Sequence, residues 1–585
     1  MSEPRQPQKG TPPIPDVAAP GVTSHEAMDK AVADVTAKKA EWTAVTAAER
    51  VALLDELAAS FAGVAERWAR AGMAAEGLDP ALPASSEEWL TGPYFTLRNL
   101  RLLKKSLQGI AAHGRPAIPG PVATLDTAVG RRVSARVFPQ DLYDRLFYTG
   151  VTAEVWMQPE VTEATLAASQ AVAYRAKDEG GVALVLAAGN VSSIGPMDAL
   201  YKLFAEDRVV VFKTHPVNDY LTPLFAEAFA PLVRRGFLRL VPGGAAEGAY
   251  LCAHPGIDEI HITGSDKTYE AIVFGPGEEG RQRKAAGTPH IAKPVSAELG
   301  NVSPVIVVPG PWSDADLAYQ AENLVTMLTN NAGFNCNATR VIVQHASWPQ
   351  REGLLDGVRR LFARVPERNA YYPGAADRYA SFLKAHPDAE RFGEEAAGKL
   401  PWTLIGGLDP SRRDDPCFTT EAFCSVFSEV GLAAASVPEY LEKAVEFANG
   451  TLWGTLNATL LVHPHSLADP DVARAFEAAI ARLRYGTVSI NHWAAIGYGL
   501  VVTPWGAPPG HPPTDIQSGN GVVHNTLLFS RVEKTVVRAP FRVWPKPAWF
   551  VTHRTADRLT ERLTRFEAAP SPAKLPGIFS LALRG

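Results

Sequence analysis

Cys336 and Glu298 are the two residues of this chain whose type and surroundings best fit covalent chemistry. Cys336 follows Gly333 among small polar residues, in Asn330-Asn-Ala-Gly-Phe-Asn-Cys-Asn, which predicts a loop. Glu298 precedes it by 38 positions, in Ala297-Glu-Leu-Gly. A thiolate is a nucleophile, a carboxylate can activate water, and the Asn190 amide can stabilise a developing oxyanion. A lone cysteine is more often a buried structural thiol, so the pair needs support from the rest of the chain.

The composition of the 585 residues limits the class of protein to which these groups can belong. With 46% hydrophobic and 20% charged residues, we expect a soluble globular protein of about two to four domains. A net charge of −5 does not indicate a basic surface of the kind that binds nucleic acid. The four cysteines include no Cys-x-x-Cys pair, so we expect no metal site, reduced thiols and a cytoplasmic location. No apolar run approaches the ~20 residues of a membrane span.

Strand-like runs alternate with helical patterns from about residue 182 onward. Three runs are typical of buried strands: Val182-Ala-Leu-Val-Leu, Arg208-Val-Val-Val-Phe and Ile257-Asp-Glu-Ile-His-Ile. Helical patterns run from Pro196 to Phe204 and from Leu221 to Arg235. A second series of the same kind begins after Glu298. This order predicts an α/β fold with a doubly wound parallel sheet, in two α/β parts. Residues 552–567 predict an amphipathic helix that docks on its own domain.

Several short motifs resemble those of the aldehyde dehydrogenase superfamily, and they occur along the chain in the same order as in that family. Gly-x-x-Cys at 333–336 followed by Arg340 resembles the nucleophile segment, and Glu298-Leu-Gly resembles the general-base segment. The remaining matches are Val211-Phe-Lys213, Ile262-Thr-Gly-Ser265, Glu421-Ala-Phe423, and the segments 449–454, 486–491 and 504–506. Each motif alone is a weak signal, but eight motifs in the correct order identify the chain as a divergent member of this superfamily. The resemblance extends from about residue 26 to about residue 545.

The resemblance implies oxidation of an aldehyde to a carboxylic acid with NAD or NADP. The route would run through a thiohemiacetal and a thioester on Cys336, with Glu298 as the general base and Asn190 as the oxyanion donor. Cofactor-binding residues would be Lys213, Gly264, Ser265, Leu299, Gly300, Glu421 and Phe423. No metal is implied.

The resemblance also implies a Rossmann-like cofactor domain, an α/β catalytic domain and a small oligomerisation arm. Residues 1–25 would be a disordered Pro-rich tail. Residues 26–297 would hold the N-terminal helices and the cofactor domain, with arm strands at about 130–158. The catalytic domain would span 298–520, the arm 521–545 and a C-terminal extension 546–585. Strands at Thr152–Met157 and within Asn525–Arg538 would extend a neighbour's sheet, giving a homodimer or homotetramer. We expect the insertion 275–294 to be a surface loop.

Departures from the family pattern leave alternatives open. Lys213-Thr-His-Pro lacks the carboxylate that usually holds the adenosine ribose, so repulsion against the 2′-phosphate of NADP is removed. Lys213 and His215 can instead offer positive charge to that phosphate. His492, Trp493 and Tyr498 suit an apolar or aromatic aldehyde, or else simply pack the domain. A coenzyme A-acylating reductase is the nearest rival, although Glu298 argues against it. A catalytically silent binding or assembly protein is the third alternative.

Overall fold

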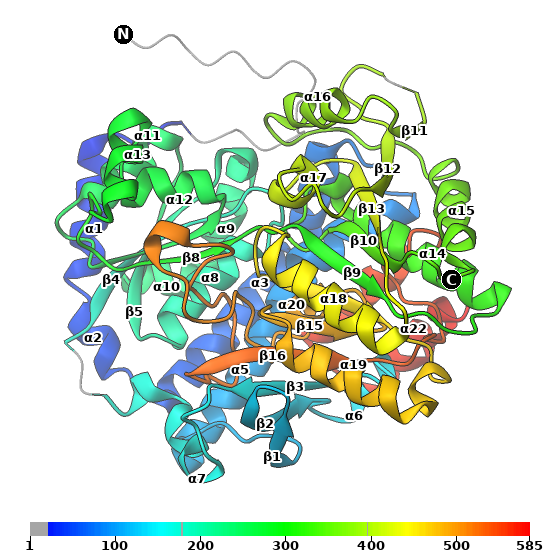
Figure 1. The fold of residues 1–585 in the computed structure, drawn as a ribbon. Helices are drawn as coiled ribbons and strands as arrows, with labels where there is room; N and C mark the ends of the chain where they lie inside the picture. Colours follow the sequence, from blue (N-terminus) through cyan, green and yellow to red (C-terminus); the bar gives the residue numbers. More distant parts are fainter. Residues whose placement is uncertain (1–20, 177–178, 395) are drawn as a thin grey trace.

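The computed structural model describes residues 21–176, 179–394 and 396–585, and most of the predicted Pro-rich tail lies outside these ranges. Within them, the strands form one sheet of five and one of eleven (Figure 1). The smaller sheet has the order β6-β5-β4-β7-β8, and every neighbouring pair is parallel. Its strands are β4 Gly181–Leu186, β5 Arg208–Lys213, β6 Leu238–Val241, β7 Glu259–Gly264 and β8 Val295–Leu299.

The larger sheet has the order β1-β2-β3-β16-β15-β14-β9-β10-β13-β12-β11. Pairing is parallel from β16 to β12 and antiparallel at both ends. Its strands are β1 Val122–Thr127, β2 Gly130–Phe138, β3 Thr152–Met157, β9 Ser303–Val307, β10 Thr339–His345, β11 Glu390–Phe392, β12 Trp402–Leu408, β13 Val426–Leu432, β14 Asn457–Leu461, β15 Thr487–Ile490 and β16 Val532–Arg538.

Helices cover both sheets, as expected for strands that are buried on both faces. In the N-terminal half they are α1 His25–Thr36, α2 Lys39–Ala44, α3 Ala47–Glu76, α4 Ser86–Trp89, α5 Phe95–His113, α6 Leu142–Phe147, α7 Glu163–Leu166, α8 Ile194–Phe204, α9 Thr222–Ala228, α10 Ala230–Arg235, α11 Ala245–Ala253, α12 Asp266–Val273 and α13 Gly277–Ala286. They continue with α14 Asp314–Thr329, α15 Arg351–Phe362, α16 Ala375–Ala385, α17 Pro416–Thr419, α18 Val437–Gly450, α19 Pro470–Arg482, α20 Ile496–Gly499, α21 Ala556–Ala568 and α22 Leu575–Ala582.

Local sequence signals explain where several of these elements begin and end. Thr46 caps α3 through a reciprocal box with Glu49, and Gly77 ends it with a left-handed φ of 69°. All six residues of β4 are buried, which matches its uninterrupted apolar run at the centre of a parallel sheet. The mixed α/β fold that the sequence predicted is therefore confirmed.

Three local expectations were wrong. The insertion 275–294 is not simply a loop, because it contains α13, which has acidic residues in its first turn and Arg283 and Lys284 in its last. Residues 525–530 form turns, and the strand begins only at Val532. The helical pattern from Leu221 to Arg235 is divided at Phe229 into α9 and α10. No helix among the described residues has both the length and the apolar character to cross a membrane.

The strands that were expected to reach a neighbouring subunit pair within this chain. β16 pairs in parallel with β15, placing Thr535 opposite Thr487, and in antiparallel with β3, placing Thr535 opposite Val155. β2 and β1 extend the same sheet outward. This end of the larger sheet is thus formed by strands of a single chain, and β1 is its outermost strand.

Candidate active site

The candidate residues gather where parallel strands of the smaller sheet end. Lys213 is the last residue of β5, Asn190 follows β4, Gly264 ends β7, and Glu298 is the penultimate residue of β8. Because these four strands are adjacent and parallel, their carboxyl ends open at the same edge. Ligands of doubly wound sheets bind at that edge. Residues far apart in sequence are thus brought to one rim by topology alone.

Cys336 is placed by a tight loop between α14 and β10. Asn331, Ala332 and Gly333 have positive φ values of 52°, 52° and 82°, which bends the chain sharply before the cysteine. A Cβ on Gly333 would lie 2.6 Å from the Cys424 carbonyl oxygen, so this position requires glycine. The buried Arg340 guanidinium donates to the carbonyl oxygens of Gly333, at 2.6 Å, and Cys424, at 2.7 Å. These bonds fix the loop that presents the thiol.

The Glu298 carboxyl and the Cys336 thiol interact electrostatically, and both line the same cavity. Burial, followed by the negative charge of Asp198, raises the pKa of Glu298 to about 8. Burial and the neighbouring Glu298 carboxyl also raise the pKa of the Cys336 thiol well above its usual range. The buried Trp505 indole donates to Glu298 Oε1 at 3.0 Å and holds the carboxyl in place. The Pro504-Trp-Gly motif is recognisable in the sequence, but nothing in the sequence predicts that Trp505 contacts Glu298.

The Asn190 side chain lies against the loop that carries the thiol. Its Nδ2 donates to the Phe334 carbonyl at 2.9 Å, two residues before Cys336, and its backbone carbonyl accepts from Asn331 Nδ2 at 2.7 Å. Asn190 lines the same cavity as Cys336 and Glu298. The structure therefore brings the three predicted catalytic residues together.

A cavity of about 1260 Å³ opens from Cys336 along the rim of the smaller sheet. Six of the seven predicted cofactor residues line it: Lys213, Gly264, Ser265, Gly300, Glu421 and Phe423. Leu299 does not line it, because its side chain points into the fully buried core of that sheet. Alternate residues of a strand face opposite ways, so Leu299 would contact a cofactor through its backbone, and its assignment stays a prediction.

Two features of this cavity fit a nucleotide. Glu421 Oε1 is buried without a hydrogen-bond partner among the described residues, so it is free to accept from a ribose hydroxyl. A Cβ on Gly300 would lie 2.0 Å from Glu421 Oε2, which explains the glycine beside it. Ser265 caps α12 by accepting from the Thr268 N–H at 3.1 Å, and the N-terminus of that helix opens into the cavity.

Lys213 and His215 line the part of the cavity next to β5. Lys213 Nζ donates to the carbonyls of Thr214, at 3.0 Å, and Gly243, at 2.5 Å. Burial and the Lys213 charge lower the pKa of His215 to about 4, so this imidazole is neutral at pH 7 and the expected positive charge comes from Lys213 alone. The acids that line the cavity are Asp266, Glu298 and Glu421, and none of them follows β5.

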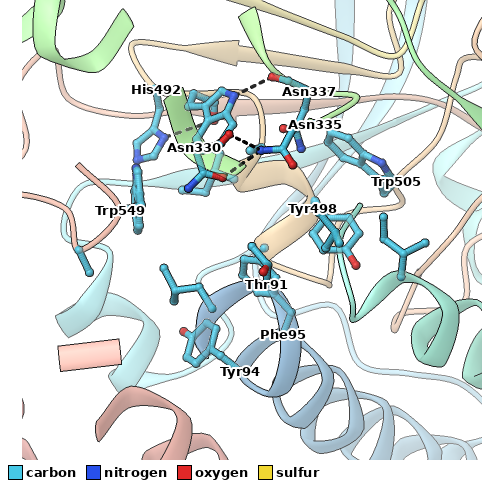
Figure 2. Close-up of a pocket in the computed structure, with 18 of the residues that line it drawn as sticks. Thr91, Tyr94, Phe95, Asn330, Asn335, Asn337, His492, Tyr498, Trp505 and Trp549 are labelled. Atoms are coloured by element: carbon cyan, nitrogen blue, oxygen red, sulfur yellow. Dashed lines mark hydrogen bonds between the residues drawn. The ribbon is translucent and has the colours of Figure 1, made fainter. Parts of the chain in front are cut away.

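Cys336 also lines a second, narrow cavity of about 100 Å³. Figure 2 shows side chains around this cavity. His492, Trp493 and Tyr498, noted in the sequence, all line it. Trp549 stands beside His492 on one side of the pocket, opposite Tyr498 and Trp505. We call this second cavity the tunnel. Cys336 lines both cavities and is therefore reachable from either.

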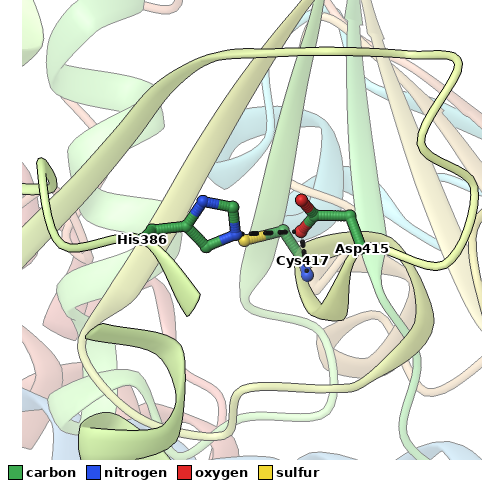
Figure 3. Close-up of side chains that lie close together, drawn as sticks. All are labelled: His386, Asp415 and Cys417. Atoms are coloured by element: carbon green, nitrogen blue, oxygen red, sulfur yellow. Dashed lines mark hydrogen bonds and ion pairs between the residues drawn. The ribbon is translucent and has the colours of Figure 1, made fainter. Parts of the chain in front are cut away.

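His386, Asp415 and Cys417 form a separate cluster in which the possible metal-ligand atoms lie within 4.8 Å of one another (Figure 3). The sequence spacing did not reveal it. Asp415 Oδ1 lies 3.0 Å from His386 Nε2 and accepts from the Cys417 N–H at 2.9 Å, which caps α17. Because these contacts already occupy that oxygen, we assign the cluster to joining α16 and α17.

Comparisons with known proteins agree with this geometry. Residues 143–365 match the model of the aldehyde dehydrogenase family. The chain is 35% identical to human 4-trimethylaminobutyraldehyde dehydrogenase over 305 residues, which is 48% of this chain and 55% of the human protein. The chain thus aligns with little more than half the length of this curated relative.

Two solved structures share the fold over most of both chains. A Mycobacterium tuberculosis aldehyde dehydrogenase complexed with NAD+ matches with a TM-score of 0.58 and 18% identity, covering 88% of this chain and 91% of the other. An NADP-dependent glyceraldehyde-3-phosphate dehydrogenase from Bacillus halodurans, complexed with NADP, matches with a TM-score of 0.56 and 18% identity, covering 88% and 92%. Residues 143–365 of this chain thus match the aldehyde dehydrogenase family, and the chain shares the overall fold of these two dehydrogenases.

Proposed function

We propose that the protein oxidises an aldehyde to a carboxylic acid, with Cys336 as the nucleophile and NAD or NADP as the hydride acceptor. The observation that carries this proposal is that Cys336 lines both a large cavity and a narrow tunnel, and that Glu298 lines the large cavity with it. One cavity has room for a dinucleotide and the other for a small substrate. The family match over residues 143–365 and the similarity to the human dehydrogenase support the same reaction class.

Acylation begins with a thiol that is neutral at rest, because its pKa is raised. Cys336 Sγ attacks the aldehyde carbon as Glu298 takes the thiol proton, which gives a thiohemiacetal oxyanion. The Asn190 amide lies next to the loop and can exchange its bond with the Phe334 carbonyl for one with this oxyanion. The bound cofactor supplies the acceptor for the hydride that leaves this carbon, and a thioester remains on Cys336.

Deacylation is the step in which Glu298 acts as general base toward water. The Trp505 indole holds one carboxyl oxygen of Glu298 at 3.0 Å. Glu298 first releases the thiol proton to solvent, and it then takes a proton from the water that adds to the thioester. As the acid leaves, the Cys336 thiolate recovers that proton from Glu298. Because the pKa of Glu298 is about 8, its base form increases as the pH rises through 8, and turnover should rise with it.

The residues that would hold the cofactor are those that line the larger cavity. Glu421 would accept from a ribose hydroxyl, and the α12 N-terminus beside Ser265 would face the pyrophosphate. Since no carboxylate follows β5 in the cavity wall, we propose that NAD and NADP are both accepted. Of the two structural neighbours, one is complexed with NAD+ and the other with NADP.

An aldehyde panel with NAD and NADP, with and without coenzyme A, tests the proposal by reduced-nicotinamide absorbance. We expect oxidation with either cofactor and no requirement for coenzyme A. Turnover that depends on coenzyme A would favour the acyl-transfer alternative, and no turnover with any aldehyde would favour the silent relative.

We propose a homodimer or homotetramer in the cytoplasm. The four cysteines are unpaired, which fits a reducing compartment. The strand edge available for a partner is β1, whose residues are half-buried or exposed, rather than β3 or β16. Sedimentation over a range of protein concentrations tests the assembly, and a concentration-independent monomer would overturn it.

A further inference from the structure

The tunnel carries no formal charge at neutral pH. Its lining contains no Asp, Glu, Lys or Arg among the described residues. Burial lowers the pKa of His492 to about 4 and raises that of Tyr94 and Tyr498 well above the ordinary tyrosine value. All three side chains are therefore neutral in the physiological range. A permanent ion entering this space would leave water without meeting a countercharge.

Part of the tunnel wall comes from the C-terminal extension, residues 546–585, which lies outside the region matched by the family model. Ala548, Trp549 and Leu563 are its wall residues. The Trp549 ring lies 5.2 Å from the His492 ring, centroid to centroid (Figure 2). Two positions later, the Val551 N–H donates to Thr326 Oγ1 at 3.0 Å, which ties this stretch to α14.

A buried ion cluster anchors the helix that carries Leu563. Glu567 lies one turn later on α21, and its carboxylate accepts from Arg98 at 2.9 Å and from Arg101 at 2.6 Å. Arg98 also donates to Asp144 at 2.8 Å, and Arg98, Asp144 and Glu567 are each at most 3% exposed. Residues four apart share one helix face, so fixing Glu567 against α5 also fixes Leu563 at the tunnel. The extension is thus firmly packed against the rest of the chain and forms an ordered part of the tunnel wall.

The aromatic rings of the tunnel are largely engaged with one another. Tyr498 makes edge-to-face contacts with Phe95 at 5.4 Å, Trp505 at 5.8 Å and His524 at 4.8 Å between ring centroids. A quaternary ammonium needs open ring faces to be held by cation–π attraction. Packed rings instead offer a hydrophobic surface, which favours an alkyl or aryl group through burial of apolar area.

We propose that the C-terminal extension closes the tunnel and thereby selects uncharged, apolar aldehydes over cationic ones. This inference rests on the proposed function, because it names the substrate class of the same site. It separates this chain from the human relative, whose name specifies a trimethylamino aldehyde. Trp549 and Leu563 are the specificity-determining residues.

A matched pair of substrates tests the substrate class. 5,5-Dimethylhexanal and 4-trimethylaminobutyraldehyde have the same shape, and differ by carbon against charged nitrogen. We expect kcat/KM to favour the neutral aldehyde by at least about 100-fold, which corresponds to roughly 2.7 kcal/mol. Equal values, or a preference for the cation, would overturn the proposal.

Wall variants test the role of the extension. Leu563→Asp places a carboxylate in the wall and should reduce the neutral-to-cationic ratio at least about tenfold. Arg558→Asp, on the exposed side of the same helix, should leave the ratio unchanged. If Leu563→Asp does not fold, as judged by melting temperature and gel filtration, Trp549→Leu is used, and should shift the preferred neutral aldehydes toward bulkier tails. A ratio and preference unaffected by either folded variant would show that the extension does not select the substrate.

A measurement without turnover separates this inference from the proposed function. Hexanamide, which cannot be oxidised, should slow alkylation of Cys336 by iodoacetamide, and a trimethylammonium amide of similar length should not. If no aldehyde is oxidised but hexanamide protects, the proposed reaction fails and the tunnel assignment stands. If aldehydes are oxidised and both amides protect equally, the reaction stands and the selectivity fails.

Discussion

The two cavities that meet at Cys336 are built in opposite ways. The larger one, about 1260 Å³, is lined by strand ends, glycines and a few charged groups such as Lys213 and Glu421. The tunnel, about 100 Å³, is lined by bulky aromatic and aliphatic side chains and no formal charge. The former offers backbone groups and polar atoms to a constant ligand. The latter offers shape and apolar surface, which are the means of choosing among substrates.

The difference indicates which changes should affect every substrate and which only some. Groups at the junction act on all substrates, because the bond changes take place there. Groups of the larger cavity should change cofactor use, and those of the tunnel should change the aldehyde preference. The following predictions test this division, from the largest expected effect to the smallest.

Cys336→Ala should remove aldehyde oxidation by at least about 10⁴-fold, because no other group at the junction can form the thioester. Cofactor binding, measured by calorimetry, should persist, since the larger cavity remains intact. Cys417→Ala is the matched control, because this thiol is buried in the separate cluster, and its turnover should be normal. Normal oxidation by Cys336→Ala would show that the nucleophile is wrongly assigned.

Glu298→Gln should slow steady-state turnover by roughly two to four orders of magnitude, the usual contribution of a general base. Acylation should suffer less than deacylation, so a burst of reduced cofactor is expected in rapid-mixing experiments. Glu278→Gln, on the exposed α13, is the control and should have no effect. Equal steady-state rates for Glu298→Gln and wild type would refute the base assignment.

His215→Glu should introduce like-charge repulsion against a 2′-phosphate at the end of β5. We expect wild type to use NAD and NADP within about tenfold, and the variant to disfavour NADP by at least about a further tenfold, or roughly 1.4 kcal/mol. Michaelis curves with both cofactors provide the measurement, with His215→Gln as the uncharged control. A thousandfold NAD preference in wild type would mean that another group reads the ribose.

Asp198→Asn should shift the pH dependence of kcat/KM. After burial, the Asp198 charge is the next largest cause of the raised pKa of Glu298, about 8 in the wild type. Removing that charge lowers the pKa, so the base form appears at lower pH and the rising limb moves down by up to about one unit. Asp198 Oδ2 accepts from Thr263 at 3.0 Å, a bond that asparagine can retain. An unmoved limb in a folded variant would exclude this coupling.

The sequence by itself determined the residues of the junction and of the larger cavity. Cys336, Glu298 and Asn190 each lie in a short motif, and Lys213 and Gly264 each end a strand that its own residues predicted. Such positions can be read from sequence because a strand end is a local property, and parallel topology then places all strand ends at one rim. For Leu299 the motif named a residue without saying which way its side chain points, and only the structure shows that this side chain enters the core.

Only the tertiary structure shows which residues form the tunnel wall and which strands pair with β16. The tunnel wall joins Tyr94, Cys336, Tyr498 and Leu563, which lie far apart in the sequence and share no local pattern. Likewise, no periodicity says whether β16 pairs with its own chain or another, since backbone hydrogen bonds are the same in both. Long-range packing has no sequence signature at the residues it joins, whereas capping, strand patterns and motifs do.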